Sequence, residues 1–162
     1  MVGEAAASSS AAAVALGVAT FIACRRWRPE SPARGMVRWV GGLLVGTMCL
    51  HAALILFGAA VIDGAFDTAL CALALSSLSA APLVAVEASS KPSSLEVGAM
   101  LGAWVGAMFL PLDWGTWWIE WPLPLIYGSC LGHIFGVAIQ MDRRTLKHRT
   151  RYAARAGPRL IS

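Results

Sequence analysis

Residues 39–62 decide the fold class, and they read WVGGLLVGTMCLHAALILFGAAVI. The stretch contains no Asp, Glu, Lys or Arg, and His51 is its one ionisable residue apart from a cysteine. Because about 20 mostly apolar residues cross the hydrocarbon core of a bilayer, the stretch predicts a transmembrane helix. The whole chain of 162 residues is 57% hydrophobic and 14% charged, whereas ordinary soluble domains are about 25% charged. This composition excludes a secreted domain, a cytosolic enzyme and a disordered tail.

Four further apolar stretches predict additional spans, at residues 5–24, 68–86, 97–112 and 121–139. The stretch 5–24 is the weakest, because it is rich in alanine and has few large side chains. We therefore expect an all-α polytopic membrane protein that forms one membrane domain over residues 1–162. It has about five transmembrane helices, or four if residues 5–24 do not span.

The positive charges fall on one side of the predicted spans. All 13 Lys and Arg residues lie in the loops 25–38 and 87–96 and in the tail 140–162. Since positive residues are retained in the cytosol, we expect these three segments to be cytosolic. The loops 63–67 and 113–120 contain no Lys or Arg, which predicts that they are lumenal or external. A basic tail next to a span typically fixes the topology and contacts anionic lipid, and nucleic acid is not an expected partner.

Polar residues inside the predicted spans are functional candidates. His51 and His133 are ionisable, and such residues within a membrane often mark a site or a path. The alternative is a neutral imidazole that hydrogen-bonds a neighbouring helix. Pro82 and Pro111 are expected to kink or end their helices unless neighbours satisfy the backbone. The span 68–86 also carries Thr68, Ser76, Ser77 and Ser79.

Glycines recur at four-residue spacing in the last two predicted spans. The two sets are Gly98, Gly102 and Gly106, and then Gly128, Gly132 and Gly136. This spacing places each set on one face of a helix and is typical of closely packed membrane helices. Two interpretations remain open: the stripes pack the hairpin 97–139 on itself, or one of them receives a helix of another protein.

Four tryptophans lie in and just after the loop 113–120: Trp114, Trp117, Trp118 and Trp121. One interpretation is an aromatic belt at headgroup depth. The other is a lumenal platform that docks a partner or a lipid-linked sugar, with Asp113 and Glu120 as hydrogen-bond acceptors. The two interpretations are compatible.

Enzymatic and metal-binding motifs find little support. The four cysteines are dispersed without a CxxC or Cys/His pair, so the sequence predicts neither a disulfide framework nor a zinc site. Three histidines are too few for a two-metal site of phosphoryl transfer. Asp113 and Glu120 could act as an acid and a base, but Thr116 is the best nucleophile near them.

Residues 101–122 resemble the signature of the PIG-F family, which comprises small polytopic proteins of glycosylphosphatidylinositol (GPI) anchor synthesis in the endoplasmic reticulum. Gly128 and Gly132 continue the match, whereas residues 115–117 and Ile119 depart from the family's Asp-Arg-Pro and Gln. The matching positions keep their spacing without gaps: Gly102, Ala103, Trp104, Gly106, Ala107, Pro111, Leu112, Asp113, Trp114, Trp118, Trp121 and Pro122.

The resemblance implies a non-catalytic subunit without a cofactor or metal. PIG-F-like proteins stabilise the large catalytic subunits that transfer ethanolamine phosphate from phosphatidylethanolamine to mannoses of the GPI precursor. It implies residence in the endoplasmic reticulum membrane, with that catalytic subunit and membrane lipids as partners. The implied motif and partner-docking residues are Gly102, Trp104, Gly106, Pro111, Asp113, Trp114, Trp118, Trp121 and Pro122, and the helix-packing residues are Gly98, Gly128, Gly132 and Gly136.

One alternative from another functional class is a stand-alone lipid transporter or scramblase. It would use His51, His133 and the polar face of residues 68–86 to line a path for lipid headgroups.

Overall fold

The computed structural model describes residues 2–25, 32–59, 62, 64–85, 92–111 and 120–156. Within these ranges every regular element is an α-helix, which confirms the predicted all-α fold class. The helices are α1 (Val2–Arg25), α2 (Pro32–Leu56), α3 (Ala65–Leu78), α4 (Ala80–Ala85), α5 (Ser94–Ala107) and α6 (Leu123–Ala156).

Four helical segments of the described chain are long and apolar enough to cross a bilayer, and α5 is a shorter apolar helix. The first of them, Gly3–Ala23, contains most of the alanine-rich stretch whose span was the weakest prediction. The other three are Ala33–Leu56, Ala65–Val84 and Leu123–Lys147. Length and composition therefore agree with a multi-pass membrane protein.

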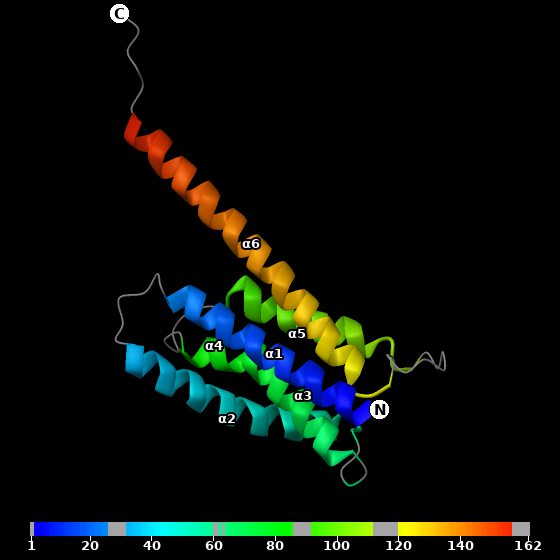
Figure 1. The fold of residues 1–162 in the computed structure, drawn as a ribbon. Helices are drawn as coiled ribbons and strands as arrows, with labels where there is room; N and C mark the ends of the chain where they lie inside the picture. The colour runs from blue at the N-terminus through cyan, green and yellow to red at the C-terminus, as the bar shows by residue number, and fades with distance from the viewer. Residues whose placement is uncertain are drawn as a thin grey trace, which may run out of the picture.

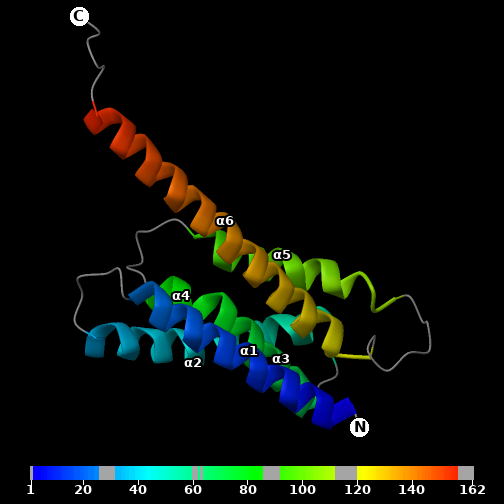
Figure 2. The ribbon, with the colours of Figure 1, turned by 45° about the horizontal axis from the view of Figure 1, so that its top comes forward.

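The helices form two packed groups (Figure 1). In the first group, α3 lies between α1 and α2, and α4 continues from α3 along α2. In the second, α5 packs against α6 more extensively than any other pair of helices in the described chain. The second group meets the first mainly where α6 lies beside α1 and α3. The view in Figure 2 shows the same division.

A break at Ser79 separates α3 from α4. Ser79 ends α3 with φ −121° and ψ −67°, and its backbone N–H donates to the Leu75 carbonyl. Pro82 follows within α4, where its ring and its missing N–H disfavour a continuous helix. This is the kink that the sequence predicts for the span 68–86, although the chain resumes a helical course until Ala85.

The helix α2 ends earlier than the predicted span 39–62, at Leu56. Gly58 has a φ of +101°, which glycine adopts readily and other residues rarely adopt. The Gly58 N–H donates to the Ile55 carbonyl at 3.0 Å, and the Ala59 N–H donates to the Leu54 carbonyl at 3.0 Å. These two bonds form a Schellman motif, which satisfies the last carbonyls of a helix and ends it.

The helix α6 extends well past the predicted span 121–139. It continues without a break to Ala156, so much of the predicted tail 140–162 is helical. Figure 1 shows this extension projecting beyond the other helices. Residues 137–156 contain neither Gly nor Pro, and Gly157-Pro158 follow; charge alone does not end a helix, because Lys and Arg are good helix formers.

Candidate functional site

The two glycine stripes face each other across the α5–α6 contact. A Cβ atom added to Gly102 would lie 2.0 Å from the Gly128 carbonyl oxygen, and one added to Gly132 would lie 2.0 Å from the Gly98 oxygen. Real Cβ atoms essentially never come within 3.0 Å of a backbone atom. The two backbones are therefore in direct contact, and only glycine fits between them.

The same contact continues to both ends of α5. A Cβ on Gly106 would lie 2.1 Å from the Pro124 oxygen, and one on Gly136 would lie 2.2 Å from the Ser94 oxygen. The Ser94 hydroxyl donates to the Gly136 carbonyl at 3.0 Å. The six glycines thus form one seam, named here the glycine seam, which packs the hairpin on itself. Because each stripe already faces the other, the geometry does not leave the seam open to a helix from another protein.

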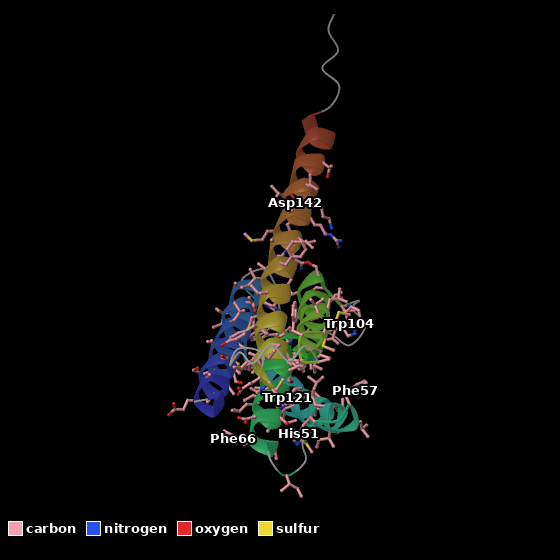
Figure 3. The ribbon with its side chains drawn as sticks, turned by 90° about the vertical axis from the view of Figure 1, so that its right-hand side faces the viewer. His51, Phe57, Phe66, Trp104, Trp121 and Asp142 are labelled. Carbon is pink, nitrogen blue, oxygen red and sulfur yellow. The ribbon has the colours of Figure 1, made fainter. Side chains whose placement is uncertain are left out.

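The outer face of the hairpin carries large apolar side chains. Trp104 is 62% exposed, although it lies between Gly102 and Gly106 in the motif. Leu101 on α5 and Phe135 on α6 are also exposed. In Figure 3, Trp104 lies on the side of α5 that is remote from α1. Trp104 is therefore available to lipid or to a partner, whereas the two glycines shape the hairpin from within.

Trp121 and Pro122 join the motif to the first group of helices. The Trp121 indole N–H donates to the Thr68 hydroxyl oxygen at 3.3 Å, and the Thr68 hydroxyl in turn donates to the Gly64 carbonyl at 3.1 Å. Pro122 is fully buried. The start of α6 is therefore fastened to the start of α3.

Part of the predicted site lies outside the described residues. Asp113, Trp114 and Trp118, together with Thr116, fall between residues 112 and 119. Pro111 is exposed at the end of the segment that contains α5. The structure therefore shows the positions of the motif glycines, Trp104, Trp121 and Pro122. The roles of Asp113, Trp114 and Trp118 remain predictions.

The two intramembrane histidines lie in different surroundings. His133 on α6 is fully buried, and its Nε2 atom lies 3.2 Å from the Thr20 hydroxyl oxygen on α1. This contact agrees with the interpretation in which the histidine bonds a neighbouring helix. His51 on α2 is half-buried, and its Nδ1 atom has no hydrogen-bond partner among the described residues.

The polar side chains of α3 are used in contacts between helices. Ser76 donates to the Leu43 carbonyl of α2 at 3.0 Å. The Ser77 hydroxyl lies 2.7 Å from the Ala74 carbonyl of its own helix and 3.4 Å from the Ala13 carbonyl of α1. Both serines are fully buried. Hydrogen bonds of this kind hold membrane helices together. Because these hydroxyls bond to carbonyls within the bundle, they do not form a continuous polar path along α3. This argues against the transporter alternative.

Two features of the structure were not predicted, although the sequence carries a signal for each. Ser93 and Glu96 form a capping box at the start of α5, in which the Glu96 carboxylate accepts from the Ser93 backbone N–H; the Ser-x-x-Glu pattern before an apolar run is its signature. The helix α1 packs on α3 through a stripe of small residues, and the buried members of the stripe are Ala6, Ser10, Ala13 and Gly17.

No three His, Cys, Asp or Glu residues come together in a metal-binding arrangement within the described ranges. Among the described residues, the site consists of the glycine seam and the surroundings of Trp104, Trp121 and Pro122.

The chain matches a known protein family and several known proteins. The model of the GPI biosynthesis protein family Pig-F matches residues 8–97 and 89–141. A protein of Pyricularia oryzae, glycosylphosphatidylinositol anchor biosynthesis protein 11, is 37% identical over 108 residues, which cover 57% of this chain and 41% of that protein. The human "GPI ethanolamine phosphate transferase, stabilizing subunit" is 27% identical over 115 residues, which cover 59% of this chain and 52% of that protein.

A fusion protein of Schizosaccharomyces pombe, "PIGF/3-ketodihydrosphingosine reductase", is 27% identical over 129 residues, which cover 69% of this chain and 26% of that protein. The chain therefore spans about half, or less, of the length of these relatives. No solved structure matches the chain.

Proposed function

We propose a function from one premise: this chain belongs to the GPI biosynthesis protein family Pig-F. We infer that it is a non-catalytic subunit that stabilises a GPI ethanolamine phosphate transferase in the membrane of the endoplasmic reticulum. The name of the human relative supports this role, because it describes a stabilising subunit of that transferase. The catalytic partner is then a separate, larger membrane protein.

The observation that carries the proposal is the glycine seam. A stabilising subunit needs a surface that is already ordered before the partner arrives, because ordering it during binding would weaken the complex. The seam holds α5 and α6 in direct backbone contact over six glycines. It therefore fixes the two backbones that carry the outer side chains, Trp104 among them.

On this proposal the motif residues divide into two roles. Gly102 and Gly106 act from inside the hairpin, and Trp104 contacts the catalytic subunit from its outer face. The motif loop with Asp113, Trp114 and Trp118 docks on the lumenal side, and Trp121 and Pro122 hold the end of that loop.

The orientation in the membrane follows from the same charge distribution that the sequence shows. All 13 Lys and Arg residues belong to the segments 25–38, 87–96 and 140–162. Positive residues are retained on the cytosolic side, so the C-terminal end of α6 is cytosolic and the N-terminal end of α1 is lumenal.

The test is mass spectrometry of the proteins that co-purify with the tagged chain in a mild detergent. We expect a large multi-span transferase subunit in the purified complex. Trp104→Ala should lower its recovery while the amount of the chain itself stays unchanged. Val45→Ala on the exposed face of α2 is the matched control and should leave recovery unchanged.

Two outcomes would contradict the proposal. A chain that purifies alone or as a homo-oligomer would contradict the subunit role. Equal recovery of the partner with Trp104→Ala would contradict the docking role of the outer face. Headgroup movement by the purified chain in liposomes would favour the transporter alternative.

A further inference from the structure

The part of α6 beyond its apolar segment carries most of its positive charge on one face. Arg143, Lys147, Arg151 and Arg155 recur there at four-residue spacing. At about 100° per residue, these four positions fall within about 120° of arc, and the position of Arg144 falls within the same arc. We call these five positions the basic stripe. The side chains of its first three members along the chain are exposed.

The chain offers the basic stripe no acidic partner along its own helix. Residues 143–156 contain no Asp or Glu, and Asp142 has no Lys or Arg three or four positions after it. In Figure 3, Asp142 already lies beyond the other helices, and Figure 1 shows the rest of α6 projecting farther. Like charges at four-residue spacing repel and destabilise a helix. An acidic group from outside the chain would remove this repulsion.

Anionic lipid reaches mainly the near end of the basic stripe. At about 1.5 Å per residue, Arg155 lies about 21 Å along the helix from Met141, the last apolar residue before the charges. A tilt of about 40° still leaves it about 16 Å from the hydrocarbon core, whereas the headgroup layer is about 5–8 Å thick. The attraction of anionic lipid falls off within a Debye length of about 8 Å. The far end of the stripe therefore faces water.

The helix also has no break at which it could bend onto the membrane surface. It is continuous to Ala156, and residues 137–156 contain neither Gly nor Pro. The basic stripe therefore stands out from the membrane as one row. Rows of residues at four-residue spacing are the ridges along which two helices commonly pack. This geometry suits a second helix better than a flat lipid surface.

We propose that the basic stripe docks an acidic helical segment of another protein in the water beside the membrane. Acidic residues at four-residue spacing on that segment form a row that matches the stripe. A single exposed ion pair contributes little, so the stripe acts through several pairs in register. The inference goes beyond the proposed subunit role and does not depend on it.

The test measures binding of a fluorescent alanine-based helical peptide with Glu at every fourth position. The full chain is held in nanodiscs of phosphatidylcholine, and binding is followed by fluorescence anisotropy. Arg151→Glu should weaken binding about tenfold, because it replaces an attraction within the row by a repulsion. Arg149→Glu is the matched control: it makes the same charge change at a position about 180° from the middle of the stripe.

The control should weaken binding less than about threefold, because its charge is on the far side of the helix and is screened by salt. Equal losses with Arg151→Glu and Arg149→Glu would overturn the proposal, since they would show a general attraction to positive charge. Equal binding of a peptide whose glutamates are distributed all around its helix would overturn the match between the two rows.

Hydrogen exchange distinguishes an acidic protein segment from lipid. The peptide should slow the exchange of backbone amides in residues 151–156, because it removes the repulsion that opens this part of the helix. Replacing part of the phosphatidylcholine by phosphatidylserine, without the peptide, should leave these amides unchanged. Slower exchange with phosphatidylserine alone would make anionic lipid the occupant of the stripe and would overturn the proposal.

Discussion

Replacing Gly102 by alanine adds one methyl group at the centre of the glycine seam. The new Cβ would lie 2.0 Å from the Gly128 oxygen, 2.8 Å from the Gly128 carbonyl carbon and 3.0 Å from the Gly132 Cα. Ordinary contacts begin at 3.4 Å. All three neighbours are backbone atoms of α6, so no flexible side chain can move aside, and the two helices must separate by about 1 Å or more.

The expected magnitude follows from that displacement. A gap of about 0.5–1 Å forfeits a quarter to a half of the contact energy along the neighbouring surface, and overpacking typically costs about 1–3 kcal/mol. A clash with backbone belongs at the upper end of this range. The better helix propensity of alanine returns up to about 1 kcal/mol. We therefore expect Gly102→Ala to destabilise the chain by roughly 2 kcal/mol.

Gly41→Ala is the matched control, because it makes the same chemical change in another apolar helix. A Cβ on Gly41 meets nothing within 4 Å, so the change in helix propensity remains and the clash does not. We expect a neutral effect or a stabilisation of up to about 1 kcal/mol. The two substitutions should thus differ in sign when unfolding is followed by circular dichroism in detergent.

The reasoning would be refuted if Gly102→Ala were no more destabilising than Gly41→Ala. That result would mean that α5 and α6 are not in backbone contact at this position. A loss of partner recovery with unchanged stability of the isolated chain would point instead to a direct contact between Gly102 and another protein.

Three further substitutions test a hydrogen bond between two helices and two helix ends by the same unfolding assay. Trp121→Phe should cost about 1 kcal/mol, because the ring still packs while the hydrogen bond to Thr68 is lost; an unchanged stability would show that this bond does not fasten α6 to α3. Gly58→Ala should cost about 1 kcal/mol or more, since alanine is strained at a positive φ, and a neutral effect would argue against the Schellman end of α2. Ser93→Ala should cost about 1 kcal/mol through the lost cap of α5; Ser94→Thr, which keeps its hydroxyl, is the control.

Hydropathy predicts the helices of this chain but does not give their ends. The apolar run of α2 continues to Ile62, but the helix ends at Leu56. Apolarity measures transfer into lipid, whereas a helix end depends on backbone hydrogen bonds and on the φ of Gly58. Glycine alone could not give the position, because Gly41 and Gly46 lie inside the same helix.

The end of α6 differs from the end of the predicted span for the opposite reason. The predicted span 121–139 stops just before the charged residues begin, and the helix continues through them to Ala156. Leaving the hydrocarbon core removes a constraint on polarity and does not remove helix propensity. The boundary of a membrane span and the boundary of a helix are therefore two different quantities.

The glycine seam illustrates how far spacing alone can carry a site prediction. A period of four places each glycine set on one face, and this much follows from the sequence. Whether the two faces meet depends on the register of α5 against α6, which places Gly102 opposite Gly128. That register is a property of the folded hairpin, so self-packing and partner binding could not be distinguished beforehand.

The hydrogen-bond partners of His133 and Trp121 could not be predicted from the sequence either. His133 contacts Thr20, and Trp121 contacts Thr68; both pairs are far apart in the chain, and threonine is common in membrane spans. Their assignment requires the placement of α1 and α3 beside α6.

The way in which the bundle uses its small and polar residues restricts the partner surface. The glycines of the hairpin are in backbone contact with each other, and the buried serines of α3 bond to α1 and α2. Neither set remains free to form the close backbone contacts or polar bonds that commonly join membrane helices. A partner that binds the outer face of α5 and α6 must therefore recognise large exposed side chains, such as Trp104 and Phe135, by shape. Binding by shape depends on rigidity, so a substitution in the glycine seam should weaken the complex even though the partner never touches it.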